Sequence, residues 1–204
     1  MKKTTIVLKI GILLPCLLFL LSCDQVNPNN ASSSIILVTR VNGYTDAGSA
    51  ADFLESDTRE GAQPGPYTYV ADIISASLEA RLKEPITVGP GPSYKNRIFL
   101  HSYDVTYTYV DSNLSPLPSP SVPANFSGEL SVAIDIDSTV DVNFVVVRAQ
   151  AKLESPLTDV TNQGAPPGIL QALATITFYG DDIAGNPVQA TGYLTVYFAE
   201  YADG

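Results

Sequence analysis

The stretch FSGELSVAIDID, residues 126–137, alternates apolar and polar side chains along most of its length. Its apolar residues share one parity, and its polar residues share the other: Phe126, Leu130, Val132, Ile134 and Ile136 against Ser127, Glu129, Ser131, Asp135 and Asp137. Successive side chains of an extended strand point to opposite faces of a sheet, so a period of two predicts a strand with one buried and one solvated face.

The same period recurs along the chain and predicts further strands at residues 35–41, 72–83, 98–110, 140–153, 170–179 and 188–199. Residues 72–83 also fit one face of a helix, but the following Pro85 and the surrounding strands favour a strand. The parity of 98–110 places His101, the one histidine, on the core side. A change of parity within 140–153 predicts a bulge near 144–146. Residues 49–56 are expected to form a short helix.

About seven antiparallel strands, separated by Gly, Pro, Asn and Asp turns, predict one all-β domain over residues 35–204. The expected architecture is an immunoglobulin-like two-sheet sandwich. No cysteine follows Cys23, which excludes disulfides and thiol chemistry within this domain, and the absence of Trp weakens any proposal of sugar stacking.

The first 22 residues have the layout of a secretory signal. Lys2, Lys3 and Lys9 precede the apolar run Ile10–Leu21, whose 12 residues are too few to span a bilayer. The run ends in LLSC, residues 20–23, which resembles the lipobox of bacterial lipoproteins. The resemblance implies that residues 1–22 form a cleaved signal helix and that Cys23 carries acyl chains, with the membrane as a partner. An uncleaved anchor, or a cysteine there by chance, is the alternative.

Residues 23–34 then form a lipidated cysteine and a polar tether, whose 11 residues after Cys23 span roughly 18 Å as a flexible coil. The predicted location is the bacterial cell envelope, and Asp24 resembles a signal for retention at the inner membrane. Loss of the three signal lysines changes the net charge from −10 to −13. Such an acidic chain excludes nucleic acid as an expected partner.

Four segments resemble small bacterial envelope proteins with an immunoglobulin-like sandwich: FLESD (53–57), LEARLKEP (78–85), VVRAQAKLESPL (146–157) and ITFYGDDIAGNPVQATGYLTVYFAEYAD (176–203). The resemblance covers most of the chain after Cys23 and is best in the final hairpin. It implies the fold and the location, and it brings no catalytic residues with it.

Two acidic turns are candidates for calcium, because carboxylate and amide oxygens are its preferred ligands. Their residues are Asp135, Asp137 and Asp141 in DIDSTVD, and Asp181, Asp182 and Asn186 in GDDIAGN. The first turn departs from an EF-hand loop, and Asp and Asn commonly shape turns by bonding their own backbone. Turn formation is therefore favoured over calcium, and no other cofactor is expected.

The final hairpin carries a candidate partner-binding strip. If Phe178 pairs with Val188, an apolar strip lies on the outward face: Ile169, Leu173, Tyr193 and Tyr197. The alternative is that residues 45–66 cover this strip.

No catalytic motif with a known spacing occurs, so the expected function is a non-enzymatic binding or structural module with an envelope protein as partner. The alternative is a carbohydrate-binding or hydrolytic domain that uses loop carboxylates and Tyr side chains.

Overall fold

The structure is a computed structural model, and it describes residues 32–61, 66–84, 97–162 and 168–201. The predicted signal peptide 1–22, Cys23, Asp24 and most of the tether lie outside the described residues. Within these ranges no helix has both the length and the apolar character needed to cross a bilayer.

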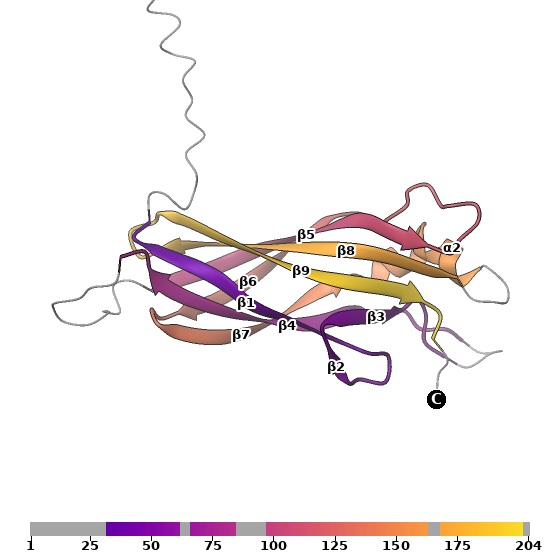
Figure 1. Ribbon diagram of the computed structural model, residues 1–204, viewed down its shortest axis with the longest axis horizontal. Coiled ribbons are helices and arrows are strands. Elements are labelled where there is room, and N and C mark those ends of the chain that lie inside the picture. The colour runs from indigo at the N-terminus through magenta and orange to yellow at the C-terminus, as the bar shows by residue number, and fades with distance from the viewer. Residues whose placement is uncertain (1–31, 62–65, 85–96, 163–167, 202–204) are drawn as a thin grey trace, which may run out of the picture.

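Two packed sheets form the protein (Figure 1). The four-stranded sheet has the order β2-β1-β4-β7, with β1 at Ser34–Tyr44, β2 at Ala50–Ala51, β4 at Asp72–Leu82 and β7 at Ser138–Val147. The five-stranded sheet has the order β3-β9-β8-β5-β6, with β3 at Phe53–Asp57, β5 at Ile98–Ser112, β6 at Phe126–Ile134, β8 at Ile169–Asp182 and β9 at Pro187–Ala199.

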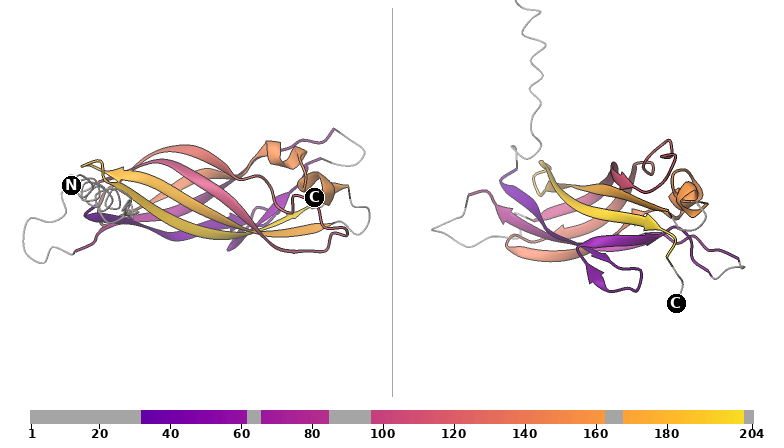
Figure 2. Two further views of the ribbon diagram at one scale, coloured as in Figure 1. Left: turned by 90° about the horizontal axis from the view of Figure 1, so that it is seen from above. Right: turned by 45° about the vertical axis from the view of Figure 1, so that its right-hand side comes forward.

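The predicted all-β two-sheet sandwich is therefore confirmed. The described residues contain nine strands rather than about seven, and one pairing, β3 with β9, is parallel. The long strands of both sheets twist together along the long axis of the molecule, as Figure 2 shows.

The core lies between the sheets and follows the alternation of the sequence. Ile134 is fully buried and Ile136 is nearly so, whereas Asp135 between them is exposed. In β8 the inward residues are all fully buried: Leu170, Ala172, Ala174, Ile176 and Phe178. Burial of such side chains contributes about 1.5–3 kcal/mol each for the larger ones, which is why the period-two pattern selects this fold.

The strand prediction for residues 72–83 is confirmed, because β4 pairs with β1 on one side and β7 on the other. The predicted bulge in β7 is also confirmed. Ile73 pairs with Val145 and Asp72 with Val147, so Val146 is the extra residue. Tyr103 of the facing sheet accepts a hydrogen bond from the backbone N–H of Val145, at 3.2 Å, which satisfies a group that the bulge leaves unpaired.

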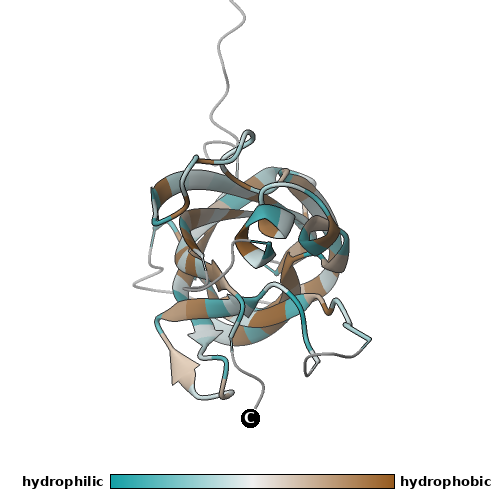
Figure 3. Cartoon of the chain, turned by 90° about the vertical axis from the view of Figure 1, so that its right-hand side faces the viewer, coloured by the Kyte–Doolittle hydropathy of each residue, from teal (hydrophilic) through white to brown (hydrophobic). Residues whose placement is uncertain are grey.

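The prediction of a strand as far as residue 153 is wrong beyond Val147. A 3-10 helix, η4 (Ala149–Leu153), and a short α-helix, α2 (Leu157–Thr161), follow instead. Leu157 and Val160 of α2 are buried, so this segment places its apolar side chains over one end of the core. The view along the long axis in Figure 3 shows the helical turns at that end, with the two sheets behind them.

The predicted short helix at residues 49–56 is also wrong. That segment forms β2 and β3, and β3 adds to the edge of the five-stranded sheet through parallel pairing from Phe53–Thr195 to Asp57–Ala199. Leu54 and Ser56 are fully buried by this pairing. Neighbouring strand edges offer unpaired backbone groups, and these outweigh a weak local helix signal.

The prediction that His101 lies on the core side is wrong. The registers of β5 with both neighbouring strands shift between Leu100 and Ser102, which makes His101 the extra residue of a bulge. Its side chain is 56% exposed. The parity of β5 changes there, so that Leu100 before the bulge and Tyr103 after it both point inward.

Candidate binding face

The outer face of β5, β8 and β9 carries the predicted partner-binding strip, although the predicted register is wrong. Phe178 pairs with Ala190 rather than Val188, and Tyr193 lies opposite Thr175 rather than Leu173. A shift of two residues preserves the parity of both strands. The strip therefore still faces outward, but each of its residues has a different neighbour.

The three central strands align their outward residues in rows across the sheet. Thr106, Thr175 and Tyr193 form one row. Thr108, Leu173 and Thr195 form the next row. A third pairing brings the hydroxyls of Thr177 and Thr191 to 3.3 Å. We call these eight residues the threonine–tyrosine face: Thr106, Thr108, Leu173, Thr175, Thr177, Thr191, Tyr193 and Thr195.

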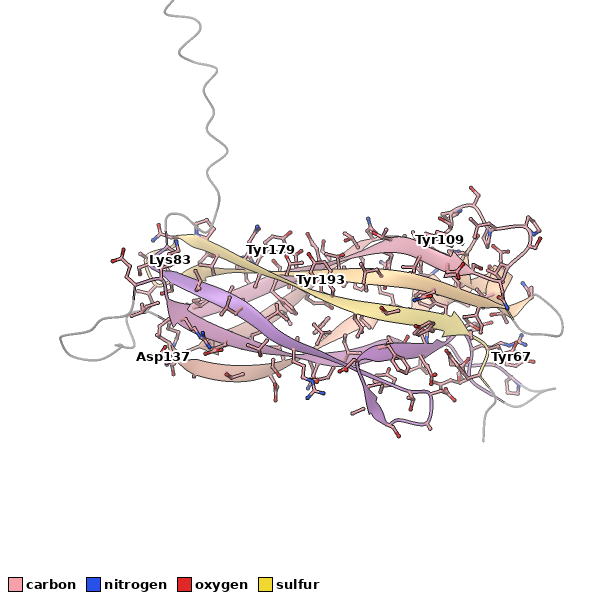
Figure 4. All side chains as sticks on the ribbon, in the orientation of Figure 1. Tyr67, Lys83, Tyr109, Asp137, Tyr179 and Tyr193 are labelled. Atoms are coloured by element: carbon pink, nitrogen blue, oxygen red, sulfur yellow. The ribbon has the colours of Figure 1, made fainter. Side chains whose placement is uncertain are left out.

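This face follows directly from strand chemistry. Threonine and tyrosine fit a pleated, half-exposed surface, and the alternate positions supply the core side chains beneath. Tyr193 is the most exposed large side chain of the face, at 62%. Figure 4 labels it in the middle of β9, with Tyr179 toward one end of the same sheet. The rows of Thr106 and Thr108 contain no carboxylate, ammonium or guanidinium group, whereas the pairing of Thr177 with Thr191 continues to Asp104 of β5.

The two ends of the predicted strip differ in exposure. Ile169 is 44% exposed, whereas Tyr197 is half-buried and its ring meets the ring of Phe53 edge-on, with centroids 5.6 Å apart. Phe53 belongs to β3, which lies within residues 45–66, the segment expected to cover the strip. This segment covers Tyr197 and leaves Tyr193 open to solvent.

A pocket of about 180 Å³ adjoins this strip at the end of β5. Its described lining consists of Asp111, Ser112, Asn113, Ile169, Gln171 and Tyr197. The register of β5 shifts between Tyr109 and Asp111, which places Asp111 opposite Gln171 on the outer face. The backbone N–H of Ile169 donates to Asn113 Oδ1 at 2.6 Å, and Gln171 Nε2 donates to the Tyr197 hydroxyl at 3.4 Å. These bonds hold the lining in place.

A row of serine, histidine and aspartate lies at the opposite end of β5, and sequence reasoning missed it. His101 Nδ1 is 2.9 Å from Ser102 Oγ, and its Nε2 is 3.6 Å from Asp181 Oδ2. The histidine–aspartate separation exceeds hydrogen-bond range. The side chains of His101 and Asp181 are both about half exposed, so water competes for each contact. The bulge at His101 brings these three side chains together, and no pattern in the sequence predicted that bulge.

The carboxylates of the first acidic turn have different partners. Asp135 accepts a hydrogen bond from Arg97 at 2.6 Å, which lowers the pKa of its carboxyl. Asp141 accepts one from Ser77 Oγ at 2.6 Å. Asp137 adopts a positive φ of 59°, a left-handed turn conformation that Asp tolerates better than most residues.

In the second acidic turn, Asp182 organises the β8–β9 loop. Its Oδ1 accepts the backbone N–H groups of Ala184 and Asn186, each at 2.9 Å, and its Oδ2 accepts the Asn186 side-chain amide at 3.0 Å. Burial alone would raise the pKa of Asp182, but these hydrogen bonds outweigh burial and lower it. Gly185 supplies the positive φ of 80° that the turn requires.

The structure thus shows turn formation by Asp182 and separate partners for Asp135 and Asp141. In the described part of the chain, no three His, Cys, Asp or Glu side chains gather where they could hold a metal ion. Calcium binding by Asp135, Asp137, Asp141, Asp181, Asp182 and Asn186 stays an alternative to their role in turns.

Comparison with known proteins does not assign this chain to a family. No protein-family model matches the chain, and no curated protein shows significant similarity to it.

Proposed function

We propose that this protein is a lipid-tethered binding module of the bacterial cell envelope, without catalytic activity, that contacts an envelope protein through the threonine–tyrosine face. One observation carries the proposal. In a chain with 21 acidic and 11 basic residues, the two rows that contain Tyr193 and Leu173 have no charged side chain.

The chemistry of the face suits protein contact. The cores of protein interfaces are depleted in charge and enriched in tyrosine, because buried charges cost more desolvation free energy than they recover. Tyr193 offers a large ring with two rotatable bonds, so it loses little conformational entropy on binding. The surrounding threonines offer hydroxyls that donate or accept hydrogen bonds.

The tether fits the same function. Strand β1 begins at Ser34, one residue earlier than expected, and the preceding Ser32 is already buried against the domain. The chain from the lipobox cysteine to this point is short. Two or more acyl chains on Cys23 would give stable anchoring and hold the sandwich close to the membrane.

The anchor is tested with a Cys23→Ser variant in bacterial cells. We expect the variant to leave the membrane fraction and to lose the mass of the acyl chains. A variant that stays in the membrane fraction at unchanged mass contradicts the anchor.

The face is tested by placing a photo-crosslinking amino acid at residue 193 in intact cells of the native source. We expect one discrete crosslinked partner, which disappears when Thr175→Asp places a charge in the same row. The matched control carries the crosslinker at Asn143, an exposed position of β7 on the other sheet. Equal crosslinking from both positions would refute the proposal.

The pocket favours a second candidate function, the binding of a small neutral saccharide. Amide groups, a tyrosine and an isoleucine surround a volume about the size of one sugar ring. Glycoside hydrolysis requires two facing carboxylates about 5–9.5 Å apart, and Asp111 is the one carboxylate in the described lining. Binding is therefore better supported than hydrolysis.

Titration with neutral oligosaccharides, followed by NMR, tests this second candidate. We expect shifts at Asn113 and Gln171 that Gln171→Leu abolishes, whereas Gln189→Leu on the same face keeps them. No shift with any oligosaccharide would dismiss the pocket as a saccharide site.

A further inference from the structure

A lysine and an aspartate meet inside the sandwich, beneath its surface. Lys152 of η4 is 1% exposed in its side chain, and Asp72 at the start of β4 is 10% exposed. Lys152 Nζ lies 3.2 Å from Asp72 Oδ1, although the two residues are 80 positions apart in sequence. After the bulge at Val146, Asp72 pairs with Val147, the last residue of β7, and η4 begins two residues after Val147.

Two hydroxyl groups complete the cluster around the Asp72 carboxyl. Ser56 Oγ, from the fully buried Ser56, donates to Asp72 Oδ2 at 2.6 Å. The hydroxyl of Tyr44 donates to Asp72 Oδ1 at 3.4 Å. Both carboxyl oxygens are therefore polarised by donors from β3 and β1, in addition to Lys152.

The charged form of this pair is costly. An ammonium group has three N–H donors. Among the described residues, Asp72 is the one hydrogen-bond partner of Lys152. An underpaired buried ammonium costs several kcal/mol in desolvation. Burial also raises the pKa of Asp72 in spite of the neighbouring lysine. Condensation of a carboxyl group with an amine would remove both charges from the interior.

We propose that Lys152 and Asp72 become joined by an amide bond once the domain has folded. The lone pair of Nζ attacks Cγ of the protonated Asp72, and the π electrons of the carbonyl move onto Oδ1, to which Tyr44 donates. A proton then passes from Nζ to Oδ2, which Ser56 polarises. The Cγ–Oδ2 bond breaks, the carbonyl re-forms, and one water molecule leaves. The reaction needs no oxidant and no other reactant.

The fold supplies what this condensation requires. The fold holds the amine and the carboxyl group in contact, so the reaction needs no bimolecular encounter. In well-oriented systems, such contact corresponds to effective concentrations of about 10⁵–10⁸ M. The site excludes the water that would reverse the reaction. The product also has one N–H donor in place of three, so fewer buried donors lack a partner. No cysteine follows Cys23, so a covalent link within this domain cannot be a disulfide.

The mass of the purified, folded chain tests the proposal, measured after denaturation. We expect the wild-type protein to be lighter than its sequence by the mass of one water, and a protease digest to contain one branched peptide that joins Lys152 to Asp72. Lys152→Met should have the full mass of its sequence. Lys83→Met, which changes an exposed lysine of the same molecule, should keep the loss of water.

An Asp72→Asn variant gives a second signature, because attack on the amide expels ammonia and yields the same product. We expect its mass to fall by one ammonia. Wild-type protein that is folded by circular dichroism and has the full mass of its sequence would overturn the proposal, whether or not the variants fold.

Discussion

Replacement of Phe178 by alanine tests whether the two sheets are held together by the core that the alternation predicts. Phe178 is fully buried in β8. Its ring centroid lies 5.2 Å from that of Phe144, nearly perpendicular, and 6.4 Å from that of Tyr103. Phe144 belongs to β7 of the other sheet, so the Phe178 ring bridges the two sheets.

The expected cost is about 3–5 kcal/mol, the range for deleting a buried phenylalanine ring. The upper half of that range applies here, because edge-to-face ring pairs contribute about 0.5–1.5 kcal/mol beyond burial of area. A loss of about 4 kcal/mol lowers the Tm of a domain of this size by roughly 8–16 °C.

Urea unfolding followed by circular dichroism measures this cost. We expect the midpoint to fall with an unchanged slope, because the surface exposed on unfolding stays nearly the same. The matched control is Tyr193→Thr on the outer face of the same hairpin, which should change stability by no more than about 0.5 kcal/mol. Equal effects of the two variants would refute the assignment of inner and outer faces.

Three further predictions concern packing, pH and one ion pair. Gly192→Ala places a Cβ 2.8 Å from Val41 and 2.9 Å from Val38 of the facing sheet, so we expect a loss of about 1–3 kcal/mol in thermal unfolding. Asp182 has a lowered pKa in the folded state, so its ionised form stabilises the fold above the ordinary pKa of about 4, and this contribution is lost as the pH falls through the folded pKa. The stability difference between wild type and Asp182→Asn should therefore shrink on acidification, as urea midpoints at several pH values would show. Arg59 contacts Glu200 at 2.5 Å, with side chains 15% and 24% exposed, so Arg59→Met should destabilise the protein by about 1 kcal/mol more than Arg40→Met, whose partner is exposed.

The sequence predicted the outward residues of the binding face but not their neighbours. The alternation assigned Leu173, Tyr193 and Tyr197 to the outward face, because parity is a local property of a strand. The hairpin register was missed by two residues. A shift of two keeps every side chain on its face, so the hydrophobic pattern cannot distinguish the two registers, and the turn held by Asp182 decides between them.

The serine–histidine–aspartate row and the lysine–aspartate pair were beyond sequence reasoning for a different reason. His101 turns outward because of a bulge, and Lys152 turns inward because a 3-10 helix follows another bulge. At the bulge in β7, the Tyr103 hydroxyl of the facing sheet accepts the backbone N–H of Val145. Tyr103 and the strands that pair with both bulged strands come from distant parts of the chain.

The order of residues by itself determined that this chain forms strands and which faces of most of them are apolar, since side-chain direction alternates with every peptide unit. It also predicted one sandwich without disulfides. Tertiary structure decided the order of the strands and the positions where bulges reverse a face. It also decided which charged groups meet inside the sandwich. These features depend on pairing between backbone groups and on packing between sheets, both of which join residues that the sequence holds far apart.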